Sequence, residues 1–575
     1  MEEFIQWLME AKDTYVDVYL SFLRYAAPAL AFILLWRCLK PLLLFKREPE
    51  IWAWLHMADG SQHALTHWEN VIGRSKSSDV RIDFPTVSRN HAVFTRYDDG
   101  SWTVTDANSK GGVTVNGQRV QICALEEDDV INIGGLDMTL VPITKRQESL
   151  QAQLRTKGAS GFDSVANLLL LTIFQCMCCL GFLFGRNPDH FASIIQGFGG
   201  ILIIQWVLFI FYAIIRRSAF EVETVAFFLC SMGMAALASI KPMEMTKQLF
   251  AMFLGILVFL IVGWSMRDLE RAKKFRYLAV ILGVGFLVFT LLFGTETYGA
   301  KAWVVIGGMT LQPSELSKVC FVYAGASAMD RLMNKRNLFL FIIYSIVICG
   351  CLALMNDFGT ALIFFVAFLV IAYMRSGSVG TIGLACTALG FAGVIAVKIA
   401  PHALRRFSIW RHIWEDPYGL GFQQTRAIMC IASGGLLGLG AGRGLLKNVF
   451  AADSDIVFAS ISEEWGLIMA SMLVLSIVAL ALFSLRSASM TRSSFYTIGA
   501  VTASAVMLTQ VILNCLGTVD VLPLTGVTFP FLSNGGSSMI GAWGLLAFIK
   551  AADTRQNASF AVRLAKKVKG GEDDE

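Results

Sequence analysis

Long apolar segments recur along most of the chain, and short polar connections separate them. In windows of about 19 residues, most of these segments are apolar enough to cross roughly 30 Å of hydrocarbon as a helix. They lie near residues 18–45, 164–185, 191–215, 223–240, 248–266, 276–293, 315–329, 337–355, 358–374, 378–398, 457–485, 494–516 and 536–551. The pattern predicts a mostly α-helical polytopic membrane protein with about 13 transmembrane helices.

Residues 49–147 interrupt this pattern. Short alternating runs such as Trp102 to Thr105 and Val130 to Ile133 are typical of strands with one buried face, and turn pairs such as Asn116-Gly117 separate them. We therefore expect an all-β domain inserted after the first transmembrane helix, followed by a polar linker at 148–163.

A second polar stretch, from Ile399 to Asp455, separates two of the apolar segments. It contains arginines, carboxylates and a glycine-rich run from Gly434 to Gly444. Structureless stretches longer than about 15 residues are uncommon unless they have a function. The sequence therefore places the chemistry in this long loop.

Composition and charge support a membrane protein and indicate its orientation. Hydrophobic residues make up 55% and charged residues 16% of the chain, which excludes an ordinary soluble protein. Basic residues concentrate in every second connection, as at Arg267 to Arg276, so the net charge of +5 does not indicate nucleic-acid binding. The positive-inside rule places these connections, the β domain and the C-terminal tail in the cytoplasm. The connections at 294–314, 399–455 and 517–537 then face outward.

The 12 cysteines do not indicate a disulfide framework or a zinc site. Most lie within apolar segments, as Cys176, Cys178 and Cys179 do, where packed thiols are expected. Without a His/Cys ligand set, no metal site is assigned. The only cofactor that the residues leave open is an oxygen-bound divalent cation, Mg²⁺ or Mn²⁺.

Three ordered elements of the β domain resemble a forkhead-associated (FHA) domain: Gly73-Arg74, Ser88 to His91, and Asn116-Gly117. The resemblance implies a β-sandwich that binds phosphothreonine through loops at one end. Arg74 and Ser88 would hold the phosphate, His91 would support the loops, and Asn116 is included in the predicted phosphopeptide site.

One departure from the FHA pattern leaves an alternative open. Where the family has Ser-x-Asn-Gly-Thr, this chain reads Ser109 to Val113, so the asparagine that grips the peptide backbone is replaced by Gly111. Lys110 could supply charge at the same place. The alternative is a sandwich that serves only as a docking surface.

The membrane part resembles the SEDS family (shape, elongation, division and sporulation), which includes RodA, FtsW and SpoVE. Five stretches in family order carry the resemblance: 299–318, 356–361, 414–423, 454–466 and 522–538. The predicted division is an N-terminal segment with one transmembrane helix at 1–48, the FHA-like domain at 49–147, the linker at 148–163, two additional helices at 164–220, a ten-helix SEDS core at 221–555 and a cytoplasmic tail at 556–575.

The resemblance implies a peptidoglycan glycosyltransferase that polymerises lipid II at the outer face of the cytoplasmic membrane during elongation, division or sporulation. Expected partners are a class B penicillin-binding protein, membrane lipid and, through the FHA domain, a phosphothreonine protein or Ser/Thr kinase. Inverting glycosyl transfer needs a carboxylate that accepts the proton of the attacking hydroxyl. Asp416 matches the essential loop aspartate of the family and is the predicted general base.

Other residues are predicted to bind the substrate around this base. Cations and backbone donors at a helix start would bear the charge of the diphosphate, a buried ion pair would lie near the outer face, and further polar or aromatic groups would line the groove. The predicted residues are Trp303, Glu315, Lys318, Arg405, Arg406, Arg411, Gln423, Asp455, Glu464, Ser533, Gly535, Gly536 and Ser537. Asp520 departs from the glycine usual in the family, and the sequence assigns it no role.

Two alternative functions remain compatible with the sequence. A transporter (flippase) of lipid-linked precursors would also have many spans and intramembrane charges, but it predicts a site at the bilayer midplane and internal repeats. A catalytically silent scaffold for division or elongation, recruited through the FHA domain, would not need Asp416, Trp303 or Glu315, which are all present.

Overall fold

The computed structural model describes residues 14–559 except 45–48, 76–77, 98, 155–159, 186–187, 298, 307–308, 329–334, 377–378, 400, 489, 492 and 556. Most of the tail expected at 556–575 lies outside this range, as does part of the N-terminal segment. Within the described residues, every apolar segment named above coincides with a helix. These helices are α2 (Thr14–Leu43), α4 (Gly161–Gly185), α5 (Phe191–Ile214), α6 (Glu221–Ile240), α7 (Met245–Ser265), α8 (Leu269–Phe293), α9 (Ser314–Ala328), α10 (Lys335–Leu354), α11 (Phe358–Ser376), α12 (Val379–Ile399), α15 (Val457–Ala488), α16 (Ser494–Thr518) and α17 (Gly536–Ala551).

Length and composition support the prediction of a polytopic membrane protein. Of the described helices, 8 are long and apolar enough to cross a membrane, and 339–354 and 358–374 are shorter apolar helices. The mostly helical fold is confirmed, whereas the number of crossings stays a prediction.

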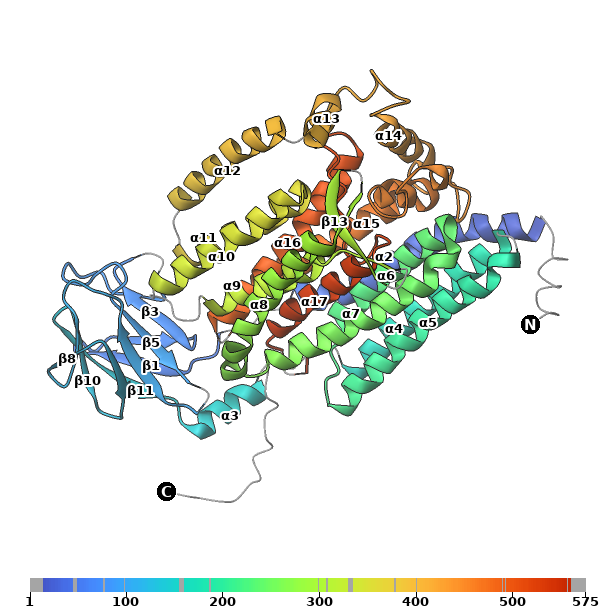
Figure 1. Ribbon diagram of the computed structural model, residues 1–575. Helices are drawn as coiled ribbons and strands as arrows, with labels where there is room; N and C mark the ends of the chain where they lie inside the picture. Colours follow the sequence, from blue (N-terminus) through green and yellow to red (C-terminus); the bar gives the residue numbers. More distant parts are fainter. Residues whose placement is uncertain are drawn as a thin grey trace.

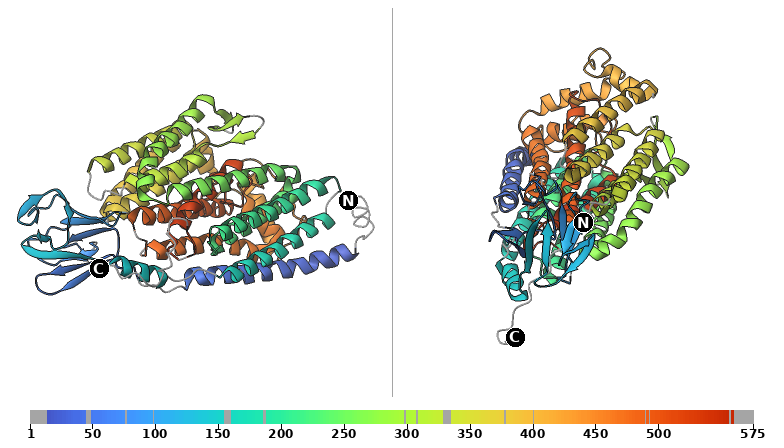
Figure 2. Two further views of the ribbon diagram at one scale, coloured as in Figure 1. Left: turned by 90° about the horizontal axis from the view of Figure 1, so that it is seen from below. Right: turned by 90° about the vertical axis from the view of Figure 1, so that its left-hand side faces the viewer.

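The β domain lies at one end of the helix bundle (Figure 1). Helix α2 begins at the far end of the bundle and ends beside this domain (Figure 2). Helices α13 (Pro401–Ile409) and α14 (Phe422–Gly434) lie at the top of Figure 1, away from the domain. The domain and the α13–α14 segment are therefore separated by the length of the bundle.

The β domain is the predicted sandwich of two sheets. One sheet has the strand order β2-β1-β11-β10-β7-β8 and the other has the order β4-β3-β5-β6-β9. Alternate residues such as Trp102 and Val104 on one sheet, and Ile131 and Ile133 on the other, are buried between them. The strands are β1 (Ala53–Met57), β2 (Gln62–Leu65), β3 (Glu69–Gly73), β4 (Val80–Arg81), β5 (Ala92–Arg96), β6 (Trp102–Asp106), β7 (Val113–Val115), β8 (Gln118–Val120), β9 (Ile122–Leu125), β10 (Val130–Ile133) and β11 (Leu136–Pro142).

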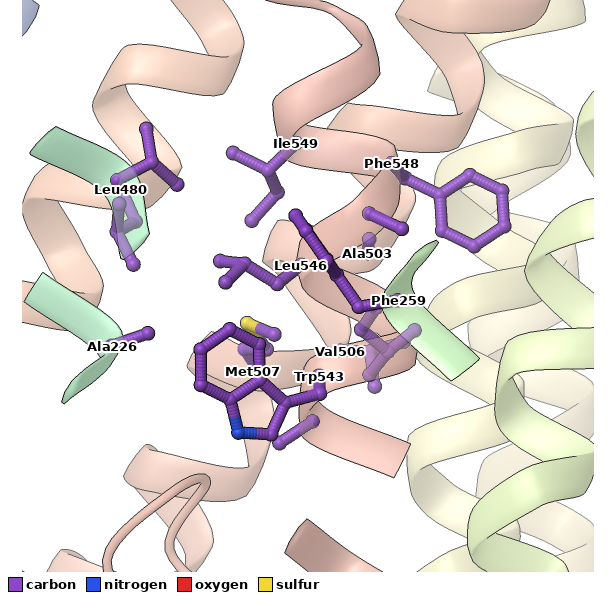
Figure 3. Close-up of a cluster of buried hydrophobic side chains, with 14 of the residues drawn as sticks. Ala226, Phe259, Leu480, Ala503, Val506, Met507, Trp543, Leu546, Phe548 and Ile549 are labelled. Atoms are coloured by element: carbon purple, nitrogen blue, oxygen red, sulfur yellow. The ribbon is translucent and has the colours of Figure 1, made fainter. Parts of the chain in front are cut away.

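The core of the helix bundle surrounds Trp543 on α17. Its indole is buried against Phe227 of α6 and Phe259 of α7, with ring centroids 5.1 and 5.7 Å apart. Figure 3 shows Met507 of α16 and Leu480 of α15 in the same cluster. Five helices from two widely separated parts of the chain therefore meet around one aromatic side chain.

The two additional helices, α4 and α5, join the bundle through buried amides. The Gln175 amide donates to Gln205 Oε1 at 2.9 Å and to Ser231 Oγ at 2.8 Å, and Gln205 returns a bond of 3.0 Å to Gln175 Oε1. Such interhelical hydrogen bonds hold helices together where the hydrophobic effect cannot. Together with α2, these helices cover α6, in which every residue from Glu221 to Ser239 is buried.

A buried ion cluster joins the start of α6 to the residues that follow α17. Arg555 lies 2.9 Å from Glu221 and 2.6 Å from Asp553, and Lys550 lies 2.9 Å from Glu223. All five side chains are at most 1% exposed. Because each charge is paired, the cluster avoids the cost of a lone buried ion.

The structure corrects the prediction that residues 399–455 form one long loop. This segment contains α13, α14 and the short 3₁₀ helix η3 (Leu446–Asn448). Proline at the first position of α13 favours a helix start, and α14 consists mainly of residues compatible with a helix. The connection before α9 also carries β12 (Thr295–Thr297), β13 (Ala300–Ile306) and β14 (Met309–Leu311), and part of the predicted linker is helix α3 (Lys145–Leu154).

Candidate functional site

Asp416 occupies a tight turn between α13 and α14. Its Oδ1 accepts the amide hydrogen of Gly419 at 3.0 Å, and its Oδ2 accepts that of Leu420 at 2.8 Å. A Cβ on Gly419 would lie 2.2 Å from Asp416 Oδ2, so any larger residue at this position would displace the carboxylate. The side chain is exposed, and each oxygen keeps a further lone pair. The turn therefore presents an oriented carboxylate to solvent, as a general base requires.

The segment that carries Asp416 is fastened to the end of α16. Asp520 Oδ1 accepts from the amide of Arg411 at 3.2 Å and from the Gln424 side chain at 3.4 Å. Gln424 also donates to the carbonyl of Gly517 at 2.9 Å, and the Trp410 indole donates to that of Val521 at 3.2 Å. Asp520, whose role could not be assigned from the sequence, thus ties the α13–α14 segment to the end of α16.

Asp455 lies beside this segment, just before α15. Burial raises the pKa of its carboxyl, while a hydrogen bond from Ser454 and the charge of Arg406 lower it. Asn514 on α16 donates to the Asp455 carbonyl at 2.9 Å. Arg406 and Asp455 are therefore close enough to interact, and Arg405 and Arg406 are both exposed on α13.

Glu464 and its neighbour Glu463 hold the glycine-rich run in place. Glu464 accepts hydrogen bonds from the amides of Gly442 at 3.1 Å and Gly444 at 3.2 Å, and from the hydroxyl of Ser239 on α6. Glu463 accepts from the amides of Leu445 at 2.9 Å and Leu446 at 3.0 Å. The structure places both carboxylates in the interior, where they order this run.

Glu315 and Lys318 form a second polar group at the start of α9. Lys318 Nζ lies 2.7 Å from Glu315 Oε2, and both side chains are almost completely buried. Nearby, the Gln312 amide donates to Ser537 Oγ at 2.8 Å and its side chain to Asp357 Oδ2 at 3.3 Å. In the described part of the chain, no hydrogen bond or ion pair joins Asp416 to this group.

The residues before α17 form a third group, which includes side chains that the sequence did not single out. Asn534 donates to Asp453 and to Glu244 at 2.7 Å each, and Lys241 lies 3.0 Å from Asp453. Gln248 accepts from the Gly535 amide at 3.3 Å. Lys241 and Glu244, Asp453, and Asn534 come from three different parts of the chain, so local sequence could not indicate that they meet.

The remaining predicted residues of the membrane part are distributed around these groups. Ser533 is buried and donates to the carbonyl of Ser454 at 2.7 Å. Gly536 is the first residue of α17. Gln423 donates to the carbonyl of Phe450 at 2.9 Å, and Trp303 is half-buried on β13 opposite Thr295.

The phosphopeptide residues predicted in the β domain divide into two sets. The Lys110 amide donates to Ser88 Oγ at 3.0 Å, and Arg74 and Lys110 are exposed beside it. His91 fastens these loops, because its ring nitrogens lie 3.0 Å from the Ser88 amide and 3.0 Å from the Gly112 carbonyl. Asn116 lies at the other end of β7, where it donates to Asp129 at 2.7 Å and holds a turn.

A metal site is not evident from the described residues. Among them, no group of three or more His, Cys, Asp or Glu side chains is placed to hold an ion. The predicted divalent cation therefore has no assigned ligands in this part of the chain.

Two family models match the sequence. The family described as "Cell cycle protein", that of FtsW, RodA and SpoVE, matches residues 219–558, and the FHA domain matches residues 70–134. The chain is 27% identical over 322 residues to the peptidoglycan glycosyltransferase RodA of Mycobacterium tuberculosis (strain ATCC 25618 / H37Rv), covering 53% of this chain and 69% of that protein. It is 27% identical over 339 residues to the probable peptidoglycan glycosyltransferase FtsW of Bacillus subtilis (strain 168), covering 54% of this chain and 83% of that protein. A solved chain from a peptidoglycan synthase complex is 24% identical, with a TM-score of 0.49, and covers 57% of this chain and 96% of that one.

Proposed function

The chain belongs to the cell cycle protein family of FtsW, RodA and SpoVE and carries an FHA domain, and from this premise we propose that it is a peptidoglycan glycosyltransferase that polymerises lipid II. The observation that carries the proposal is Asp416. It lies within the family-matched region, on an exposed turn that two backbone amides orient. A transporter or a silent scaffold does not require an oriented and exposed carboxylate at this position.

In the proposed reaction, Asp416 accepts the proton of the acceptor hydroxyl as that oxygen attacks the anomeric carbon of the donor sugar. The bond between this carbon and the diphosphate oxygen breaks, and the lipid diphosphate leaves with the electron pair. Charge that develops on a leaving group is stabilised by oriented cations. Arg405, Arg406 and Arg411, which lie on or next to α13, are the cations proposed for this role.

The test is polymerisation by the purified full-length chain in lipid nanodiscs supplied with lipid II. We expect glycan strands to form, with or without a class B penicillin-binding protein, and a chelator added to the same assay tests the divalent cation prediction. Movement of lipid II across the bilayer without polymer would instead support the transporter.

The proposed orientation places Asp416 outside and the β domain in the cytoplasm. The β domain contacts the α15–α16 connection, whose basic residues predict a cytoplasmic location. A cysteine at Gln423 should then be labelled in intact cells by a thiol reagent that cannot cross membranes. A cysteine at Asp99 should be labelled only after permeabilisation, and labelling of both in intact cells would contradict the orientation.

We further propose that the FHA domain binds a phosphothreonine protein. Arg74→Ala should weaken the binding of a phosphothreonine peptide to the full-length chain by about 10- to 100-fold, because hydrogen bonds to charged groups contribute about 1.5–3 kcal/mol. Fluorescence anisotropy with a labelled peptide and its unphosphorylated twin measures this. Arg146→Ala, an exposed arginine on α3, is the control and should bind as wild type does. Equal affinity for both peptides would leave the domain as a docking surface only.

A further inference from the structure

A buried carboxylate joins the β domain to the helix bundle. Glu69, the first residue of β3, is 6% exposed and faces the start of α16. Its oxygens accept hydrogen bonds from Ser493 Oγ at 3.0 Å, from the Ser494 amide at 3.0 Å and from Ser494 Oγ at 2.8 Å. We call this group of three residues the Glu69 seam.

The seam lies at a position where a negative charge is favourable. The first amides of a helix lack partners within the helix, and the helix dipole adds positive potential there. Ser493 also caps α16 from within by accepting the amide hydrogen of Phe495. The Glu69 carboxylate of the β domain completes the helix cap by accepting the amide hydrogen of Ser494.

Further contacts beside the Glu69 seam join the β domain to the helix bundle. A ring nitrogen of His67 lies 2.9 Å from the carbonyl oxygen of Thr491, and Lys273 Nζ lies 5.7 Å from the ring centroid of Tyr97. The Tyr496 hydroxyl on α16 donates to the carbonyl of Met266 at 2.8 Å. The β domain thus contacts the α15–α16 connection and the start of α8, not α16 alone.

The far end of α16 holds the segment that carries Asp416. At 25 residues α16 is about 37 Å long, and much of its surface is buried against α9, α11, α15 and α17. Gln424 and Asp520 fasten the α13–α14 segment to its last turn, and Asn514 fastens Asp455. A packed helix with fixed contacts at both ends can transmit a displacement from one end to the other.

The phosphate-binding loops stay accessible while the domain is docked. Strand β3 runs from Glu69 in the seam to Gly73, and Arg74 follows as an exposed residue. Lys110 and Arg89 are exposed as well. A phosphopeptide and the helix bundle therefore use different ends of one strand.

We propose that Glu69 is a positioning residue. By docking the FHA domain onto α16, it keeps the α13–α14 segment on the opposite side of the bundle conformationally ordered. This inference goes beyond the proposed function. It requires only that the α13–α14 segment becomes less ordered when the contacts of the Glu69 seam are lost. It also predicts that the FHA domain is a built-in part of the membrane core and not a loosely tethered module.

The experiment compares full-length wild type, Glu69→Ala, Glu69→Gln and the control Asp59→Asn in nanodiscs. Asp59 is an exposed carboxylate of the same domain that accepts from the Ser61 amide within its own turn. Hydrogen exchange is followed in peptides covering 493–497 and 410–424, and lipid II polymerisation is measured in parallel. Thermal unfolding of the β domain verifies that each variant is folded.

In Glu69→Ala we expect exchange at 493–497 to rise about 10- to 100-fold, as loss of charged hydrogen bonds implies. Exchange at 410–424 should rise too. Polymerisation should fall by about 2- to 30-fold, which is the size of effect seen when a mutation alters the coupling between two sites without contacting a ligand. Glu69→Gln keeps one acceptor oxygen, so its exchange rates and its polymerisation should lie between those of wild type and Glu69→Ala. Asp59→Asn should match wild type in both measurements.

Two results would overturn the proposal. Unchanged exchange at 493–497 in Glu69→Ala would mean that the carboxylate does not hold the seam. Faster exchange there, with no change at 410–424 or in polymerisation, would make Glu69 a local helix cap. If wild type forms no polymer, the proposed function fails, but the two exchange readouts still decide this inference.

Discussion

Replacing Asp416 by asparagine is expected to lower lipid II polymerisation by about 100- to 10,000-fold, the range over which proton transfer by a positioned side chain contributes to rate. Asparagine keeps the size of the side chain and one acceptor oxygen for the Gly419 amide, but it cannot take up a proton. The contacts of Arg411 and Gln424 with Asp520 remain, so the segment should stay attached to α16.

Glu415→Gln is the matched control for this prediction. Glu415 is the adjacent exposed carboxylate and lies 3.1 Å from His412, a surface pair of the kind that contributes little to stability. Purified Glu415→Gln should polymerise lipid II within about twofold of wild type, because it has no part in proton transfer. An Asp416→Asn protein with activity within a few-fold of wild type would contradict the assignment of the base.

Arg555→Ala is expected to destabilise the helix bundle by about 3–5 kcal/mol, because it removes the cation that is paired with the buried carboxylates of Glu221 and Asp553. Both lie within hydrogen-bonding distance of the guanidinium, at 2.9 and 2.6 Å. The measurement is the midpoint of denaturant-induced unfolding of the purified protein, followed by tryptophan fluorescence. Arg555→Lys should lie between wild type and Arg555→Ala, since lysine keeps the charge but not the planar fork that reaches two carboxylates.

An exposed ion pair provides the comparison for Arg555. Arg81 and Asp83 lie 2.7 Å apart, with side chains 46% and 69% exposed. Arg81→Ala should change the free energy of unfolding by less than about 1 kcal/mol. If both substitutions have the same small effect, the cluster around Arg555 does not stabilise the bundle.

The sequence predicted the helices and the sandwich because both depend on local pattern. A helix such as α16 is a mostly apolar segment without charged residues, and β6 and β10 alternate buried residues with more exposed ones. These periodicities are written in neighbouring residues. The family membership of both parts was likewise evident from short motifs, and the family matches confirm it.

The candidate site was predictable only in part. Asp416 could be named from its motif, and the structure adds the amides that orient it. The role of Asp520 could not be predicted, because its partners Arg411 and Gln424 are about a hundred residues away in sequence. The Glu69 seam spans a still longer separation, and nothing in the local sequence of β3 indicates a partner on α16.

Some residues contribute to structure where the sequence suggested contact with a ligand. Asn116 was included in the phosphopeptide site, and the structure shows it fastening the turn after β7. Glu464 was named among the substrate-binding residues, and it accepts hydrogen bonds from the amides of the glycine-rich run. In each case a polar residue in a family motif accepts hydrogen bonds from backbone amides, at an exposed turn for Asn116 and in the interior for Glu464.

The buried ion cluster also has a consequence for biosynthesis. Glu221 is paired with a residue made 334 positions later, and Glu223 with one made 327 positions later. At about 5–20 residues per second, the ribosome needs roughly 15 to 70 seconds to cover that distance. During this interval the two carboxylates of α6 lack the cations of Lys550 and Arg555, and Glu223 can accept only from earlier residues such as Tyr212, whose hydroxyl lies 2.7 Å from it in the finished structure. The ion pairs that join the start of α6 to the end of the helix core can therefore form only once Lys550 and Arg555 have been made.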